Sequence, residues 1–218
     1  MPDERSRIVA AGYDLAARRY ATWASHVEGD PRERMTVELD ARLPEGARVL
    51  DLGCGSGLPS TRALAEHHDV VGVDASRIQI RLARTNVPKA RFIEADIADV
   101  AFPDGSFDGV VAYYSISHVP RAEHAAIFER VARWLVPGGL FLASLGATDS
   151  PDWVGTWLGV PMFFSAFKAD RNRALLQTAG FDLLIDEVVE IREPDGPATF
   201  LWVLAQTRVA AVRRSPAR

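Results

Sequence analysis

The chain of 218 residues has little lysine, one cysteine and no long apolar run. Lys89 and Lys168 are its two lysines among 25 basic residues, and we associate this bias toward arginine with a GC-rich bacterial genome. Cys54 stands alone, so neither an intrachain disulfide nor a metal site of several cysteines can form. No run approaches the roughly 18 apolar residues that a membrane span requires. These absences predict a cytoplasmic protein that does not enter a membrane.

The sequence also lacks an excess of positive charge. Its formal net charge is −4 at pH 7, which argues against a broad phosphate-binding face because nucleic-acid binders concentrate basic side chains. The first residues, MPDERSRIVAAGYD, carry acids early and have no continuous apolar core, so they do not resemble a signal peptide. We therefore expect no nucleic-acid partner and no secretion signal.

What is present is an alternation of short apolar strands and helices. Strands are expected at residues 48–52, 69–73, 91–94, 107–113 and 140–145. Helices are expected at residues 5–28, 30–42, 58–68, 76–84 and 121–135. Such alternation implies βαβ crossovers and a parallel sheet. A helix at 170–180 then precedes two strands, 182–191 and 199–206, whose turn-rich spacer predicts an antiparallel pair.

The most informative segment is a glycine-rich loop after the first of these strands. Gly53, Gly55 and Gly57 lie between a strand and a helix, where glycine lets the backbone turn sharply and approach a ligand. Such loops usually bind a pyrophosphate, but that pattern favours a third glycine where Leu58 stands. Asp51 precedes the loop and would repel phosphate while suiting an ammonium group. The loop therefore predicts a zwitterionic or cationic ligand, with a purely structural turn as the alternative.

Two further acids follow the next strands. Asp74 ends the second strand, at about the spacing at which a Rossmann acid binds ribose hydroxyls. Asp96 follows the third strand. Open α/β sheets bind ligands at the carboxyl ends of their strands, so these two acids and Asp51 form one candidate site. Helix capping by Asp74 and loop capping by Asp96 are the structural alternatives.

Over roughly residues 45–145 the chain resembles the class I S-adenosylmethionine-dependent methyltransferases. The resemblance rests on Asp51-Leu-Gly-Cys-Gly-Ser-Gly57, Gly72-Val-Asp74, Asp96-Ile97, Phe107-Asp-Gly-Val-Val111 and Leu135-Val-Pro-Gly-Gly139. It implies an α/β fold, a Rossmann-like three-layer sandwich whose seven-stranded, mostly parallel sheet has an antiparallel C-terminal strand. The expected pair of terminal strands fits this fold.

The resemblance also implies S-adenosylmethionine as the cofactor, S-adenosylhomocysteine as its product, and no metal. The glycine loop would face the methionyl part of the cofactor, Asp74 would bind the ribose, and Asp96 would accept a hydrogen bond from the adenine amine. The residues expected to bind the cofactor are Asp51, Gly53, Cys54, Gly55, Gly57, Asp74, Ala75, Asp96, Ile97 and Tyr113.

Two residues near the end of the fourth strand are candidates for catalysis. Tyr114 would lie near the sulfonium, which aromatic faces stabilise by cation–π attraction. His118 would act as a base or orient the acceptor, and a hydrogen bond from His118 to a loop carbonyl is the alternative. His124 is expected on a helix surface. Methyl transfer is an in-line displacement, so positioning carries much of its rate.

Two aromatic segments flank the candidate site. We expect one methyltransferase domain at residues 1–207, with an N-terminal helical cap at 1–44, an aromatic-rich lid insertion at 147–169 and a flexible basic tail at 208–218. Packing on the sheet is the alternative for the cap, and a homodimer interface is the alternative for the lid. The expected acceptor-binding residues are Tyr13, Tyr20, Trp153, Trp157, Phe163 and Phe164.

Together these features predict methyl transfer to a hydroxyl or amine of a small, partly apolar or aromatic metabolite. Two other classes of function stay open. One is a regulatory subunit that binds S-adenosylmethionine without catalysis, which product formation on any acceptor would exclude. The other is an NAD(P)-dependent oxidoreductase, whose glycine pattern fits less well and which binding of NADH would reveal. A related aminopropyl transferase would need further acids lining an amine channel.

Overall fold

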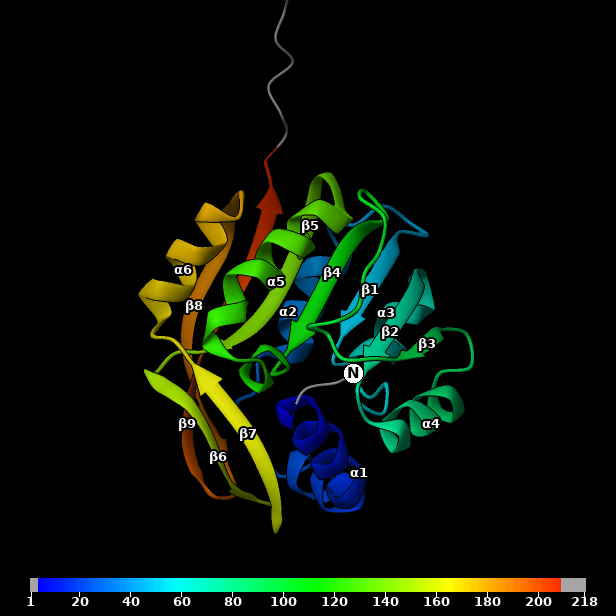
Figure 1. Cartoon of the computed structure of the whole chain (residues 1–218). Helices are drawn as coiled ribbons and strands as arrows, with labels where there is room; N and C mark the ends of the chain where they lie inside the picture. Colours follow the sequence, from blue (N-terminus) through cyan, green and yellow to red (C-terminus); the bar gives the residue numbers. More distant parts are fainter. Residues whose placement is uncertain (1–3, 209–218) are drawn as a thin grey trace, which may run out of the picture.

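The structure, a computed structural model, describes residues 4–208. Its centre is a seven-stranded sheet with the order β3-β2-β1-β4-β5-β9-β8 (Figure 1). Neighbouring strands are parallel from β3 to β5, whereas β9 is antiparallel to both β5 and β8. The strand order reverses between β1 and β4. The crevice at which open α/β sheets bind ligands therefore lies at the carboxyl ends of these two strands.

The elements follow the expected alternation closely. The strands of the sheet are β1 (Arg48–Leu52), β2 (Asp69–Asp74), β3 (Arg91–Glu94), β4 (Phe107–Tyr113), β5 (Leu135–Gly146), β8 (Phe181–Glu193) and β9 (Gly196–Thr207). The helices are α1 (Glu4–Ala24), α2 (Arg32–Asp40), α3 (Ser60–His67), α4 (Arg77–Asn86), α5 (Arg121–Trp134) and α6 (Ala169–Thr178), with a short 3-10 helix η1 (Ile116–His118). The predicted first helix ends early because the backbone of Glu28 pairs with Arg192 of β8.

Helices cover both faces of the sheet. On one face α5 and α6 bury Phe128 and Leu176 against the central strands. On the other face α2, α3 and α4 bury Met35, Leu64 and Ile80. Strands buried on both faces need near-continuous apolar sequence, which is why Val110–Ala112 of β4 reads as an uninterrupted hydrophobic run. The expected Rossmann-like three-layer sandwich with an antiparallel C-terminal strand is confirmed.

A second sheet of two strands was not anticipated. β6 (Ser150–Trp157) and β7 (Val160–Ala166) form an antiparallel hairpin within the segment expected to be a lid. Its turn uses Leu158 at φ +49° and Gly159 at φ +72°, the positive values that tight hairpin turns require. The bulky aromatic side chains of this segment signalled burial but not strand alternation, and Leu-Gly is not a strong hairpin signal.

The hairpin and α1 lie together at one edge of the central sheet. In Figure 1 they sit beyond the end at which the arrows of β1 and β4 terminate. β7 packs on α1 through a small apolar cluster of Val9, Met162 and Phe163. The division into a cap, a lid and a single domain stays a prediction. Residues 209–218 of the predicted tail lie outside the described residues, while Arg208 forms an ion pair with Asp182 at 2.9 Å.

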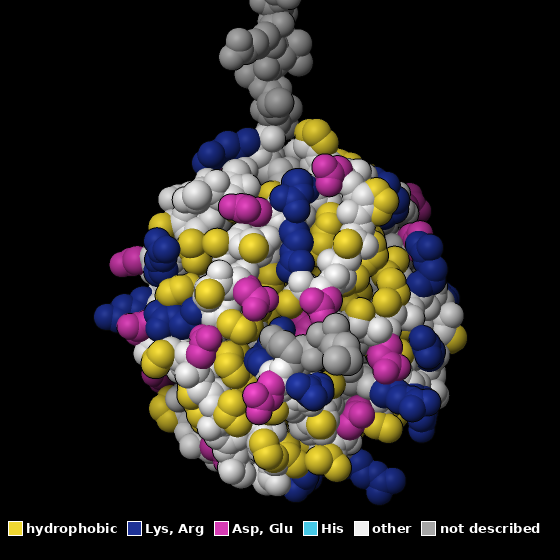
Figure 2. Space-filling view, in the orientation of Figure 1, with side chains coloured by type: hydrophobic (Ala, Val, Ile, Leu, Met, Phe, Trp, Pro, Cys, Tyr) yellow, Lys and Arg dark blue, Asp and Glu magenta, His cyan; other side chains and the backbone are white. Residues whose placement is uncertain are grey.

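The surface carries charges of both signs. On the face shown in Figure 2, acidic and basic side chains are interspersed and no continuous basic surface forms. None of the helices within residues 4–208 combines the length and the apolar character needed to cross a membrane.

We predict that Gly53→Ala destabilises the protein more than Gly105→Ala does. Both glycines have positive φ, at +80° and +66°, so both substitutions introduce backbone strain of about 1 kcal/mol. A Cβ at position 53 would also overlap the Cβ of Ser115, whereas a Cβ at position 105 would meet open space. Urea denaturation should show an additional loss of about 2 kcal/mol or more for Gly53→Ala. Equal losses of stability in the two variants would mean that Gly53 and Ser115 can move apart to accommodate the added Cβ.

Candidate functional site

The glycine-rich loop is tied to β2 by backbone hydrogen bonds. The amides of Gly53 and Cys54 both donate to the carbonyl of Val73, at 2.7 and 3.0 Å. Gly53, Gly55 and Gly57 all have positive φ, which residues with a Cβ adopt reluctantly. A Cβ at position 55 would meet nothing within 4 Å. The loop therefore leaves open space beside Gly55 on a rigidly held backbone.

Two carboxylates flank this loop, Asp51 buried and Asp74 partly buried. Asp51 is 2% exposed, and its Oδ2 accepts a hydrogen bond from the hydroxyl of Thr61 at 2.6 Å. Asp74 accepts from the amides of Gly55 and Ser76, at 2.9 and 2.8 Å. Burial raises the pKa of each carboxyl group to about 6. Groups that suffer such desolvation are well suited to a ligand that supplies hydroxyl or ammonium donors.

The third acid is already engaged by α1. Asp96 accepts from the amide of Ala98 at 2.8 Å and from Nη1 of Arg5 at 2.6 Å. The two side chains of this ion pair are 7% and 11% exposed. Ile97 is buried at 8% exposure, and Ala75 is partly buried. The structure therefore assembles the acids of the predicted cofactor site, but it shows a guanidinium on the carboxylate that we predicted to bind adenine.

The two tyrosines at the end of β4 face α2. The hydroxyls of Tyr113 and Thr36 are hydrogen-bonded at 2.7 Å. Tyr114 has φ +58°, a conformation that is uncommon outside glycine and often marks functional positions. The guanidinium of Arg32 lies 4.9 Å from the ring centre of Tyr114 and 5.7 Å from that of Tyr113. Burial raises the pKa of both tyrosines, so neither is suited to act as a base.

His118 is buried, and both of its ring nitrogens are engaged. Its Nδ1 lies 2.9 Å from the carbonyl oxygen of Phe163, and its Nε2 lies 2.8 Å from the hydroxyl of Tyr13. Burial lowers the pKa of His118 to about 4, so the ring is neutral near pH 7. The carbonyl contact that we considered as a structural alternative is present, and the role of base stays a prediction.

Most of the expected acceptor-binding side chains meet in one aromatic cluster. The ring centres of Tyr13 and Tyr20 are 5.3 Å apart, and both lie 5.9 Å from Trp157. Phe164 lies 5.0 Å from His118 and 5.8 Å from Trp157. Trp153, at 45% exposure, stacks on the outer side of Phe164. The side chain of Phe163 instead joins the apolar contact between β7 and α1.

Three polar residues of the N-terminal segment were missed. Arg32 forms an ion pair with Asp30 at 3.3 Å beside Tyr114. Arg5 binds Asp96, and Asp14 accepts from both the hydroxyl of Ser76 and the amide of Ile78 at the start of α4. Charged residues in helical sequence normally indicate a solvated face. Nothing local marks these three as partners of residues about 60 to 90 positions away in the chain.

The expectation for His124 was wrong. It is 3% exposed, and its Nε2 donates to the carbonyl of Val119 at 2.9 Å. The residue lies on the face of α5 that packs between the sheet and Phe167 of the segment after β7. The unpredicted hairpin leads into the segment that buries it.

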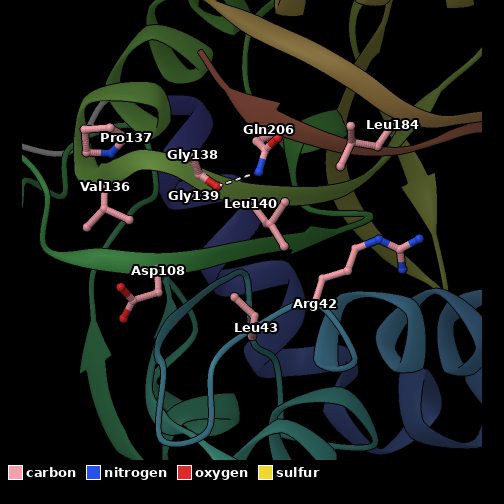
Figure 3. Close-up of a pocket in the computed structure, with 10 residues that line it drawn as sticks. All are labelled: Arg42, Leu43, Asp108, Val136, Pro137, Gly138, Gly139, Leu140, Leu184 and Gln206. Atoms are coloured by element: carbon pink, nitrogen blue, oxygen red, sulfur yellow. Dashed lines mark hydrogen bonds between the residues drawn. The ribbon is translucent and has the colours of Figure 1, made fainter. Parts of the chain in front are cut away.

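A groove of about 340 Å³ lies at the opposite edge of the sheet (Figure 3). Its lining includes Asp108 at the start of β4 and Gly138 near the start of β5, where Gln206 donates a hydrogen bond to the Gly138 carbonyl at 2.9 Å. This is the amino-terminal edge of the parallel strands, away from the side on which such sheets bind ligands. Among residues 4–208, no group of three or more His, Cys, Asp or Glu side chains could hold a metal ion.

Comparisons with known proteins agree with this geometry. A family model described as a methyltransferase domain matches residues 49–139. The chain is 34% identical to methyltransferase GfsG of Streptomyces halstedii, over 91% of this chain and 81% of that protein. The chain belongs to the class I S-adenosylmethionine-dependent methyltransferases.

Two other similarities support the fold of this methyltransferase but do not identify its substrate. It is 34% identical to an O-methyltransferase of Pyrenophora dematioidea over 74% of this chain, but it spans only 64% of that relative's length. A crystal structure of the 4+2 cyclase SpnF matches 96% of this chain and 99% of that chain, with a TM-score of 0.73 and 20% identity. A likeness at this level of identity shows the fold alone, because one fold hosts many reactions.

We predict that Asp74→Asn changes how stability depends on pH. In the folded methyltransferase the pKa of Asp74 is raised from 3.8 to about 6. Its folded state therefore keeps a proton that the unfolded chain loses, and stability falls as pH rises through this window. Relative to the wild type, the free energy of unfolding of Asp74→Asn should increase by about 2 kcal/mol between pH 4 and pH 7.

Urea denaturation at several pH values measures this difference. Asp104→Asn is the control for the same substitution at an exposed position, since the Asp104 side chain is 75% exposed. A flat difference for Asp74→Asn would contradict the burial of an ionisable carboxyl group at this position.

Proposed function

We propose that this methyltransferase transfers a methyl group from S-adenosylmethionine to a hydroxyl or amine of a small, partly apolar or aromatic metabolite. One observation carries the proposal. The crevice between β1 and β4 brings the glycine loop and the desolvated acids Asp51 and Asp74 to the same edge of the sheet as a neutral, buried His118 within an aromatic cluster. Cofactor recognition and acceptor recognition thus meet at the topological switch point.

The residues present fit the cofactor. A side chain at position 55 would occupy space that the structure leaves open, so the backbone there can be approached closely. Asp74 would hold the ribose hydroxyls, Asp51 the amino group, and Asp96 the adenine amine beside Ala75 and Ile97. Arg32, near Tyr114 and attracted electrostatically to Asp51, supplies a cation for the carboxylate of the methionyl part. When bound, the sulfonium supplies an electrophilic methyl group.

The chain's own residues supply orientation, exclusion of water and a proton acceptor. Tyr20, Trp157 and Phe164 would hold an apolar acceptor between α1 and the β6–β7 hairpin. Tyr114 would face the positive charge with its ring. His118 is neutral at physiological pH and can accept a proton from a hydroxyl acceptor. An amine acceptor that reacts unprotonated has less need of this base.

Two competing functions have weaker support. An oxidoreductase that binds a dinucleotide would place a pyrophosphate beside the buried Asp51 carboxylate, which is electrostatically unfavourable. A regulatory subunit without catalysis is compatible with the cofactor site, but the aromatic cluster around His118 then has no role. We also propose a cytoplasmic, bacterial enzyme that needs no metal. The homodimer interface at residues 147–169 stays a prediction.

Calorimetric titration with S-adenosylhomocysteine tests the cofactor assignment, with NADH titrated in parallel. We expect saturable binding of the thioether alone, and a loss of at least tenfold in its affinity for Asp74→Ala because the ribose loses a carboxylate partner. Asp104→Ala should bind like the wild type. Binding of NADH alone, or unchanged affinity in Asp74→Ala, would overturn the assignment.

A further inference from the structure

The contact between Tyr13 and His118 fixes the tautomer of the histidine. The carbonyl oxygen of Phe163 can only accept a hydrogen bond, so Nδ1 of His118 carries the proton that it donates across 2.9 Å. In the neutral ring Nε2 is then unprotonated, and the hydroxyl of Tyr13 donates to it across 2.8 Å. The single basic nitrogen of His118 is therefore occupied by a phenol of the same chain.

The ring of this phenol lies in an aromatic cage. Tyr20 meets it edge-on at 5.3 Å between ring centres, His118 at 5.3 Å and Trp157 at 5.9 Å. Phe164 extends the cage beyond His118 and Trp157. Edge-to-face packing of this kind favours aromatic over aliphatic occupants of similar size. The cage thus selects for a flat ring with a hydroxyl group directed at Nε2.

The occupant of the cage is a side chain of α1, the helix that also carries Tyr20. The described contacts of α1 with the site include the side chains of Arg5, on Asp96, and of Asp14, on Ser76 and Ile78. The remaining walls come from η1, which continues β4, and from the β6–β7 hairpin. Rotating the Tyr13 side chain out of the cage breaks its hydrogen bond to His118 and no backbone hydrogen bond, so α1 and Tyr20 can stay in place.

We propose that the acceptor is a phenol or another ring-bound hydroxyl compound, which displaces the Tyr13 side chain and takes over both its cage and its hydrogen bond to Nε2 of His118. This inference rests on the proposed function and narrows its acceptor to aromatic hydroxyl compounds. In this proposal the Tyr13 side chain occupies the acceptor's position until the acceptor binds. The sequence alone had suggested that Tyr13 binds the acceptor.

The chemistry balances without a further reactant. As the acceptor oxygen bonds to the methyl carbon, its proton passes to Nε2 of His118. The carbon–sulfur bond of the sulfonium breaks and leaves its electron pair on sulfur, which becomes a neutral thioether. The imidazolium formed at His118 is buried, and the same burial that lowers the pKa of His118 favours release of the proton to water after the product leaves.

The experiment uses the full chain saturated with S-adenosylhomocysteine and two probes, 4-nitrophenol and 4-nitrotoluene, the second of which has a methyl group in place of the hydroxyl group. All measurements are made at about pH 6, where the hydroxyl of 4-nitrophenol keeps its proton and His118, with its pKa lowered to about 4, is still neutral. Calorimetry should show at least tenfold tighter binding of 4-nitrophenol to the wild type. Tyr13→Phe removes the competing hydroxyl but keeps the ring, so it should bind 4-nitrophenol three- to tenfold more tightly than the wild type. Thr22→Val removes a hydroxyl from the same helix, one that donates to Arg18, and should leave the affinity unchanged.

Kinetics with 4-nitrophenol and S-adenosylmethionine separate displacement of Tyr13 from proton relay through it. Displacement predicts that Tyr13→Phe lowers KM and retains kcat, while His118→Ala loses at least tenfold in kcat. A loss of kcat in Tyr13→Phe as large as that in His118→Ala would show that Tyr13 relays the proton, and would overturn the proposal.

Equal affinity of the wild type for the two probes would also overturn the proposal, and this result does not depend on any variant folding. Failure of the proposed function gives a different pattern. Without binding of S-adenosylhomocysteine the methyltransferase assignment fails, while a preference of the protein alone for 4-nitrophenol would still support the cage.

Discussion

The closure of α1 over the carboxyl edge of the sheet is the constraint on which the site depends. Three side chains of this helix bind groups at that edge: Tyr13 on His118, Asp14 on the start of α4, and Arg5 on Asp96. These contacts bury groups that the parallel sheet alone would leave at the rim of a crevice. The geometry of the site is therefore a property of α1 and the sheet together.

The electrostatic consequence is a set of buried groups whose charged forms are disfavoured. Burial raises the pKa of Asp51 and Asp74 and lowers the pKa of His118. A ligand that supplies hydrogen bonds to these carboxylates would offset the effect of their desolvation. In the proposed reaction the two acids bind the cofactor, and the neutral histidine accepts a proton from the acceptor.

Much of the fold followed from the sequence because parallel strands leave a strong signal. Fully apolar runs such as Val110–Ala112, glycines at positive φ in the loop after β1, and acids at successive strand ends are all set by local chemistry. The hairpin of β6 and β7 was missed because its aromatic side chains report burial and not periodicity. Arg208, expected in a flexible tail, forms an ion pair with Asp182 that its sequence did not indicate.

The candidate site was predictable up to the point at which distant segments meet. Asp51 and Asp74 occupy the places that their strands dictate, and Tyr13, Tyr20, Trp157 and Phe164 do form one cluster. The partner of His118 and the partner of Asp96 could not be predicted, because each lies about 90 to 105 residues away on α1. Their pairing depends on how that helix docks, and its sequence indicates only that it is a helix.

A crystal structure of the protein with S-adenosylhomocysteine tests the central claim most directly. The account predicts the thioether between β1 and β4, with its ribose hydroxyls on the carboxylate of Asp74 and its methionyl part against the backbone of Gly53–Gly57. A ligand bound elsewhere, such as the groove beside Asp108 and Gly138, or a ribose without contact to Asp74, would contradict it.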